Sequence, residues 1–259
     1  MTGAALIVTY HAVEPGPAPL CIDPGLFKEH LDWLSASGAR MMTVSELGTA
    51  LERGDAPPGA VALTFDDGFA SVVDEAAPLL VERGLVATVF CVSGHLGRRN
   101  DWATQPPGAP LRPLARAREL RSLARAGFEI GSHGWDHAPL TGASESLARR
   151  ELLDSKDALE HAIQAPVGSF AYPYGAAPSP AAEALVRRAY LAACTTSLGM
   201  ARTGSDPFAL PRVDCHYLRR PAMLRLAVSG SLGPYLEVRR LAARARRTVR
   251  KDYLETARR

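Results

Sequence analysis

The sequence predicts an α/β fold in which strands and helices alternate around a parallel sheet. Short apolar runs rich in Val, Ile, Phe and Thr recur along the chain, and segments with the 3.6-residue period of amphipathic helices separate them. Polar clusters follow several of these runs directly, as is typical of the carboxyl ends of parallel strands. The length of 259 residues suits one α/β barrel with a single large core.

Seven apolar runs are the expected strands. They cover residues 5–10, 60–65, 85–92, 128–132, 167–172, 191–196 and, with the weakest pattern, 208–213. About seven strand–helix repeats favour a barrel or near-barrel, with a doubly wound open sheet as the alternative.

Five amphipathic segments are the expected helices, and several of them end in glycine as helices often do. They cover residues 26–38, 72–84, 114–127, 144–163 and 180–189. Residues 95–113 are rich in Pro, Gly and Arg without a clear period, and such a long connection indicates a loop that lines a substrate cleft. Trp102 in this loop either stacks on a sugar ring or packs the loop onto the barrel.

Composition excludes several classes of protein. A net charge of +3 is too small to indicate nucleic-acid binding, and no apolar stretch is long enough to span a membrane. Four cysteines without a C-x-x-C pair are typical of small buried residues in a reducing compartment. The first residues, "MTGAALIVTYHAV", lack a basic leader and lead straight into a strand pattern, so we expect a cytoplasmic protein without a signal peptide.

The end of the chain differs in charge from the rest. Between Glu237 and Arg259 there are nine Lys or Arg residues against three Asp or Glu. We therefore expect a barrel domain over residues 1–235 and a basic helix over 236–259 that packs on it or trails from it. An arginine-rich face is usually only solvated, but contact with an anionic membrane surface or with an acidic partner is the alternative. Membrane contact would make the protein peripheral at the membrane.

Two adjacent carboxylates, Asp66 and Asp67, end the run "VALTFDDGF". Because side chains alternate across a strand, two neighbouring acids cannot both be ordinary surface residues unless the strand ends there. Their position therefore indicates a functional role. Holding a cation and moving a proton are tasks that suit this pair.

Two further polar clusters follow other strand runs. "EIGSHGWDH" places His133 and His137 four residues apart, and "SFAYPYG" places Tyr172 and Tyr174 after a third run. Two histidines in one turn and one carboxylate make a site that suits zinc, and also cobalt or nickel. A metal held in this way lowers the pKa of bound water to about 7. The second carboxylate, which does not bind the metal, is then free to accept the proton of that water.

The motifs "TFDDG", "SHGWDH" and "FAYPYG" resemble the first three motifs of the polysaccharide deacetylases, the NodB-homology or carbohydrate esterase family 4 enzymes. The resemblance covers roughly residues 6–212 and implies a distorted (β/α)7 barrel that removes N-acetyl or O-acetyl groups from sugars. It implies that Asp66 is the catalytic base, that Asp67, His133 and His137 bind the metal, and that the backbone N–H of Tyr174 stabilises the oxyanion.

Departures from the family pattern concern the arginine beside the base and the general acid. Ala171 stands where the third motif usually has arginine, and the fourth motif and the final Leu-x-His are missing in their standard forms. His11, after the first strand run, resembles the early histidine of the circularly permuted branch that includes the poly-N-acetylglucosamine deacetylases. His11 is therefore the expected acid, with His216 as competitor. Arg212 either supplies the missing positive charge or serves on the surface or as a helix cap.

The expected function is therefore metal-dependent N-deacetylation of an amino sugar or N-acetylated saccharide, with Trp102, Tyr172 and Arg212 as substrate-binding residues. Alternatives on the same scaffold are an O-acetyl esterase, a deformylase or non-sugar amidase, and a carbohydrate-binding protein without catalysis. Nucleic-acid binding is not expected, and the oligomeric state is left open.

Overall fold

Seven parallel strands close into a barrel within the residues that the computed structural model describes, which are 4–106, 108–175 and 178–239. The order around the barrel is β1, β5, β6, β7, β8, β9 and β11, and β11 pairs with β1 to close it. These strands are β1 (Ala4–Tyr10), β5 (Ala60–Phe65), β6 (Thr88–Cys91), β7 (Glu129–Ser132), β8 (Ser169–Ala171), β9 (Ala192–Leu198) and β11 (Leu210–Asp214). The expected barrel is confirmed, and each of its strands overlaps one of the seven apolar runs.

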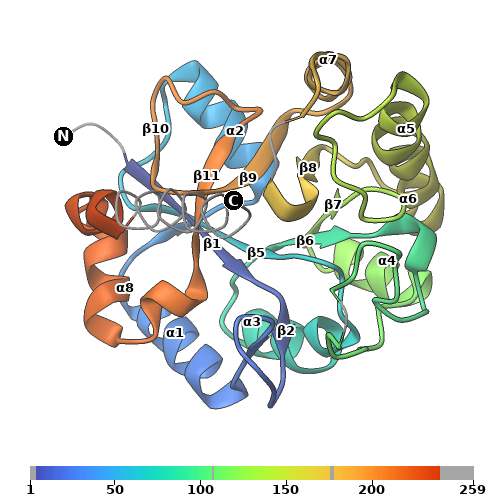
Figure 1. Cartoon of the computed structure of the whole chain (residues 1–259). Helices are drawn as coiled ribbons and strands as arrows, with labels where there is room; N and C mark the ends of the chain where they lie inside the picture. The colour runs from blue at the N-terminus through green and yellow to red at the C-terminus, as the bar shows by residue number, and fades with distance from the viewer. Residues whose placement is uncertain (1–3, 107, 176–177, 240–259) are drawn as a thin grey trace, which may run out of the picture.

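Helices surround the central strands (Figure 1). They are α1 (Pro24–Ala36), α2 (Val44–Arg53), α3 (Ala77–Glu82), α4 (Ala117–Arg125), α5 (Glu145–Arg149), α6 (Ser155–Ile163), α7 (Pro180–Ala189) and α8 (Pro221–Val228), with π-helical turns η1 (Val72–Ala76) and η3 (Arg150–Asp154). Short 3-10 turns are η2 (Ser93–His95), η4 (Pro173–Gly175) and η5 (Cys215–Leu218). All five expected helices are present.

Alternate residues of each barrel strand face opposite sides, as the pleat requires. Along β1, Leu6, Val8 and Tyr10 belong to the large core between strands and helices, whereas Ala5 and Ile7 belong to a smaller cluster. Small side chains dominate the strand positions of that smaller cluster, and apolar residues of α2 pack among them. The interior of the barrel is therefore filled by side chains and is not a pore.

The helix α2 closes the end of the barrel at which the strands begin. Its first residues contact the starts of β6 and β7, where the N–H of Val44 donates to Thr88 Oγ1 (3.0 Å) and the N–H of Ser45 donates to Glu129 (3.2 Å). A side chain at Gly48 would lie 2.5 Å from Ala192, so only glycine allows this close approach. Because α2 occupies this end, the carboxyl ends of the strands form the open mouth.

Several elements were not expected from the sequence. They are α2, α8 and the short strands β2 (Ala12–Val13), β3 (Cys21–Ile22), β4 (Arg40–Met41) and β10 (Ala201–Arg202). The helix α2 carried a readable signal, since Thr43 and Glu46 form a capping box and Gly54 ends it in the left-handed conformation. The two-residue strands carry no periodic signal, because two residues are too few to show an alternating pattern.

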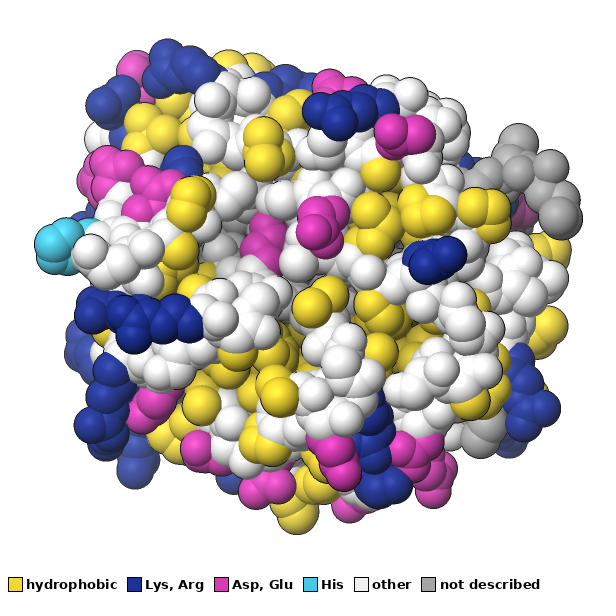
Figure 2. All heavy atoms as spheres, turned by 180° about the vertical axis from the view of Figure 1, so that it is seen from behind, with side chains coloured by type: hydrophobic (Ala, Val, Ile, Leu, Met, Phe, Trp, Pro, Cys, Tyr) yellow, Lys and Arg dark blue, Asp and Glu magenta, His cyan; other side chains and the backbone are white. Residues whose placement is uncertain are grey.

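The expected division of the chain near residue 235 is not tested. Residues 233–239 are helical, so this helix begins before the expected boundary, and residues 240–259 of the basic tail lie outside the described residues. On the face in Figure 2, basic and acidic side chains are interspersed and form no continuous basic surface. Within the described parts of the chain, no helix has the length and apolarity needed to cross a membrane.

Candidate active site

One cavity of about 800 Å³ opens at the carboxyl ends of the barrel strands. All nine residues assigned to the site from the sequence line it: His11, Asp66, Asp67, Trp102, His133, His137, Tyr172, Tyr174 and Arg212. The competing histidine, His216, lines it as well. The convergence expected from the polar clusters at strand ends is therefore present in the structure.

Asp66 follows β5 and forms a buried ion pair with Arg212 of β11. The guanidinium donates through Nη1 to Oδ1 and through Nη2 to Oδ2, each at 2.7 Å. Burial opposes ionisation of Asp66, but the charge and hydrogen bonds of Arg212 outweigh this effect and hold the pKa of the carboxyl well below its usual range. Asp66 is therefore a carboxylate of fixed orientation throughout the neutral range.

Four of the five N–H groups of the Arg212 guanidinium have partners in the protein. It also donates through Nε to the carbonyl of Thr195 (2.9 Å) and through Nη1 to Thr64 Oγ1 (3.2 Å), and it is only 2% exposed. Of the roles considered from the sequence, the structure places Arg212 in that of the charge missing at Ala171. Its contacts are with Asp66 and the barrel, and the side chain also lines the cavity.

Asp67, His133 and His137 bring three donor atoms together. The Nε2 atoms of the two histidines lie 3.2 Å apart, and each lies 3.5 Å from Oδ1 of Asp67. His133 donates from Nδ1 to the carbonyl of Ala171 (2.7 Å), which leaves its Nε2 lone pair directed toward the other two donors. Two imidazole nitrogens and one carboxylate oxygen, buried and within 4.8 Å of one another, fit a divalent transition metal.

Burial shifts two of these donors toward their neutral forms. It raises the pKa of Asp67, although the nearby histidines act in the opposite sense, and it lowers the pKa of His137 well below its usual value, with further lowering by His133. A neutral His137 keeps a lone pair available at neutral pH. A cation among the three donors would offset the cost of burying the Asp67 carboxylate.

Two aromatic side chains enclose His137. The ring of Trp102 stacks on it with centroids 4.5 Å apart, and the ring of Tyr174 meets it edge-on at 4.6 Å. Trp102 is 4% exposed, so its contact with His137 matches the packing role considered from the sequence more directly than a sugar platform. The Tyr174 hydroxyl donates to the Thr104 carbonyl (2.8 Å) and thereby ties the loop containing Trp102 to the β8 end.

Tyr174 has a left-handed backbone, with φ of 59°, and Gly175 follows at 62°. This conformation is uncommon for a tyrosine. The next residue must be glycine, because a side chain at Gly175 would overlap Thr196. Tyr172, the other residue of this cluster, is 2% exposed and donates its hydroxyl to the Phe208 carbonyl (3.2 Å). Tyr172 therefore contributes mainly a wall of the cavity.

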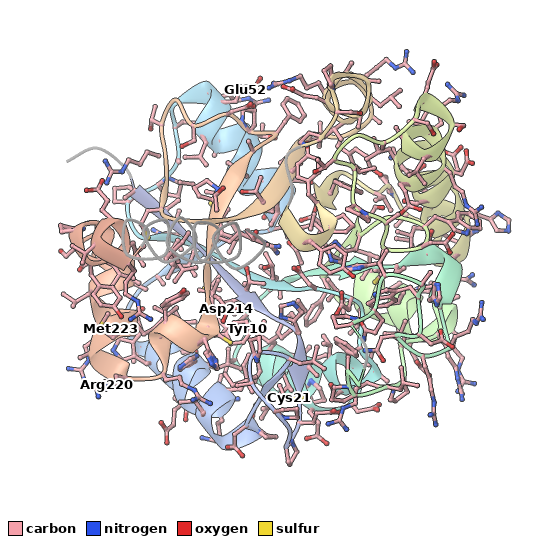
Figure 3. The ribbon with its side chains drawn as sticks, in the orientation of Figure 1. Tyr10, Cys21, Glu52, Asp214, Arg220 and Met223 are labelled. Carbon is pink, nitrogen blue, oxygen red and sulfur yellow. The ribbon has the colours of Figure 1, made fainter. Side chains whose placement is uncertain are left out.

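The two candidate acids follow neighbouring strands, His11 after β1 and His216 after β11. β1 lies between β5 and β11, with Tyr10 opposite Phe65 and Thr9 opposite Asp214. Figure 3 shows Tyr10 and Asp214 side by side at these strand ends. His11 therefore follows the strand next to that of Asp66, whereas His216 lies on η5, where its N–H donates to Asp214 (2.8 Å). Both histidines face the cavity.

The remaining polar residues of the histidine turn have supporting contacts. Ser132 accepts from the N–H of Gly134 (3.2 Å) and so braces the turn. The side chain of Asp136 pairs with Arg150 (2.9 Å) and His95 (3.5 Å). Glu151 was missed in the sequence because nothing in its helical surroundings indicates its partners, which are backbone N–H groups 13–16 residues earlier in the chain.

Relatives among characterised proteins are distant. The chain is 26% identical over 208 residues to YxkH of Bacillus subtilis, whose name places it among the polysaccharide deacetylases, and covers 70% of that protein and 80% of itself. It is 25% identical over 196 residues to the poly-beta-1,6-N-acetyl-D-glucosamine N-deacetylase of Staphylococcus epidermidis. That match covers 72% of this chain but 65% of the relative, and the Staphylococcus aureus counterparts are covered over 52% of their length.

Solved structures share the barrel. IcaB from Ammonifex degensii matches with a TM-score of 0.71 and 24% identity, over 88% of this chain and 97% of that one. The Streptococcus pyogenes deacetylase PplD in complex with acetate matches with a TM-score of 0.70 and 24% identity, over 83% and 93%. At this identity the likeness supports the fold.

The sequence profile of one family also matches the chain. The model described as "Polysaccharide deacetylase" covers residues 53–192, which is more than half of the sequence and includes the carboxylate pair, the histidine turn and the tyrosine loop. By this match, and with the seven-stranded barrel in place, the chain belongs to the polysaccharide deacetylase family.

Proposed function

We propose that this chain is a metal-dependent hydrolase that removes the N-acetyl group from an amino sugar or N-acetylated saccharide. The observation that carries the proposal is the adjacency, in one cavity, of a buried Asp66–Arg212 ion pair and the three donors of Asp67, His133 and His137. The name of the Staphylococcus epidermidis relative, an N-deacetylase of poly-beta-1,6-N-acetyl-D-glucosamine, supports the substrate class.

The residues divide into those that hold a metal and those that move protons. A divalent metal, with zinc as first choice and cobalt or nickel as alternatives, would polarise the acetyl carbonyl and lower the pKa of water to about 7. Asp66 accepts the proton of the attacking water, because Arg212 keeps it ionised while each carboxylate oxygen retains a further lone pair. The two adjacent carboxylates thus have different roles, with Asp66 as proton acceptor and Asp67 as metal ligand.

Stabilisation of the oxyanion and protonation of the leaving nitrogen complete the reaction. The backbone N–H of Tyr174 is the proposed donor to the oxyanion, and its left-handed conformation at the cavity wall supports that assignment. His11 is the proposed general acid, because its strand lies directly beside that of Asp66. It gives its proton to the departing amine.

The experiment that tests this function is acetate release from a panel of N-acetylglucosamine compounds of increasing length. The protein is first stripped of metal and then resupplied with zinc, cobalt or nickel. Release that requires metal is expected, and an O-acetylated sugar in the same panel separates amide from ester hydrolysis.

Two variants assign the chemistry. Asp66→Asn is expected to bind metal like the parent protein and to lose turnover, whereas Asp67→Asn is expected to lose the metal. Normal turnover by Asp66→Asn would overturn the proposed base. Metal binding without acetate release from any compound would move the proposal to a different acyl substrate.

A further inference from the structure

The turn that carries the two histidines has an unusual backbone. Gly134 has φ of 88° and His137 has φ of 55°, so two residues of this short turn are left-handed. Left-handed residues interspersed in a turn direct successive backbone N–H groups to one side and create a concave anion site. Here the N–H groups of Trp135, Asp136 and Ala138 face the same partner.

That partner is the carboxylate of Glu151. Its Oε2 accepts from the N–H groups of Trp135 (3.0 Å), Asp136 (3.2 Å) and Ala138 (3.3 Å), and Oε1 accepts from Asp136 as well (3.2 Å). Glu151 is completely buried, and a side chain at Gly134 would overlap its Oε2 atom. The carboxylate therefore fills the concave side of the turn, and the glycine is needed to admit it.

The segment that carries Glu151 is itself firmly anchored. It belongs to η3, and a π-helical turn inside a longer helix is an insertion that often marks a functional position. The Tyr190 hydroxyl donates to the carbonyl of Leu152 (2.7 Å), and the hydroxyl of Ser155 contacts that of Ser132 at the start of the histidine turn. Glu151 thus connects this anchored segment to the backbone of residues 135–138 in the histidine turn.

We propose that Glu151 is a positioning residue for the metal site, because its carboxylate fixes the turn in the conformation that directs both histidines toward Asp67. The proposal rests on the metal site of the proposed function. A glutamine at this position would keep the shape of the side chain and could keep an acceptor oxygen at Oε2, but its NH2 group would replace Oε1 and face the N–H of Asp136. It would also replace the charge-assisted hydrogen bonds from three N–H groups by weaker neutral ones, so the substitution tests the contribution of the negative charge at nearly constant volume.

The test compares Glu151→Gln with Glu160→Gln as the matched control. Glu160 lies on the next helical segment, where its carboxylate accepts from the N–H of Val167 (2.9 Å) away from the histidine turn. Affinity for Zn²⁺ is measured on folded, metal-free protein by competition with a chromophoric chelator. Glu151→Gln is expected to weaken binding by about 10- to 100-fold, as for lost partners that orient metal ligands, and to change the absorption spectrum of bound Co²⁺. Glu160→Gln is expected to lower the melting temperature without changing either property.

Two results would overturn the proposal. One is Zn²⁺ affinity within twofold of the parent protein for folded Glu151→Gln, with an unchanged Co²⁺ spectrum. The other, which needs no variant, is rapid hydrogen exchange at the N–H groups of Trp135, Asp136 and Ala138 in the metal-free parent protein, where protection is expected. If the parent protein binds no metal while these N–H groups remain protected, the metal-dependent function fails although the contact with Glu151 exists.

Discussion

Asp66 and Arg212 meet across the barrel mouth in a two-pronged ion pair, with both N–O distances at 2.7 Å, although 146 positions separate them in the sequence. Both residues are almost completely buried. A buried carboxylate beside three metal donors would be neutral or mobile without such a partner. The arginine of β11 therefore supplies the positive charge beside Asp66 that Ala171 cannot provide.

Arg212→Lys is expected to lower kcat/KM by about 100-fold, because an ammonium group cannot hold both oxygens of Asp66 in one orientation. The weaker partner lets burial raise the pKa of Asp66, so the acidic limb of the pH–rate profile moves to higher pH. Arg187→Lys, which alters an exposed ion pair with Glu183 and Asp206, is the control. An unchanged acidic limb in Arg212→Lys would show that Arg212 does not control the pKa of Asp66.

His11→Gln and His216→Gln distinguish the two candidate acids. Loss of the general acid is expected to reduce kcat by about 10²- to 10⁴-fold for His11→Gln, with unchanged metal affinity. His216→Gln is expected to stay within a few-fold of the parent protein. The opposite ranking would assign the acid to His216, which lies two strands from Asp66 instead of one.

Trp102→Ala is expected to lower the free energy of unfolding by about 3–5 kcal/mol, since it removes a large buried ring from contact with His137. It is also expected to weaken Zn²⁺ binding, because the imidazole loses its stacking partner. Trp102→Phe retains an aromatic face and is expected to restore most of the metal affinity. A rise in KM with unchanged stability and metal affinity would instead support direct contact between Trp102 and the sugar.

The barrel was predictable from the sequence because most positions of its strands are buried on both faces and appear as short apolar runs, with β11 as the weakest of them. The catalytic mouth was predictable for the related reason that polar residues must begin where those runs end. Asp66, Asp67 and His133 follow such ends directly, and His137 lies in the turn that begins at His133.

Contacts formed by the backbone across the fold were not predictable. Glu151 lies in an ordinary amphipathic pattern, and its role depends on the φ angles of Gly134 and His137, which no residue pattern near it encodes. The partner of Arg212 was likewise open in the sequence. Barrel closure between β11 and β1 settles it by placing the arginine near the end of β5.

A buried histidine outside the active site predicts how stability depends on pH. His30 of α1 is 2% exposed, and its Nδ1 lies 2.9 Å from the hydroxyl of Tyr10. Burial lowers the pKa of His30 from 6.5 to about 4, and the backbone of Leu218 offsets part of this effect. The folded protein therefore holds His30 neutral under conditions in which the unfolded chain protonates it.

The contribution of neutral His30 is fully present above the unfolded pKa and is lost as the pH falls toward the folded pKa. Between about pH 7 and pH 4.5 the loss should amount to about 2.4 kcal/mol, because the unfolded chain binds the proton below about pH 6.5 at about 1.4 kcal/mol for each further pH unit. Urea unfolding of the parent protein and of His30→Gln across this range measures it, with exposed His161→Gln as control. The variant is expected to lose less stability than the parent protein on acidification, since every other titrating group is common to both. Equal losses in the two proteins would show that His30 accepts a proton in the folded state as readily as in the unfolded chain.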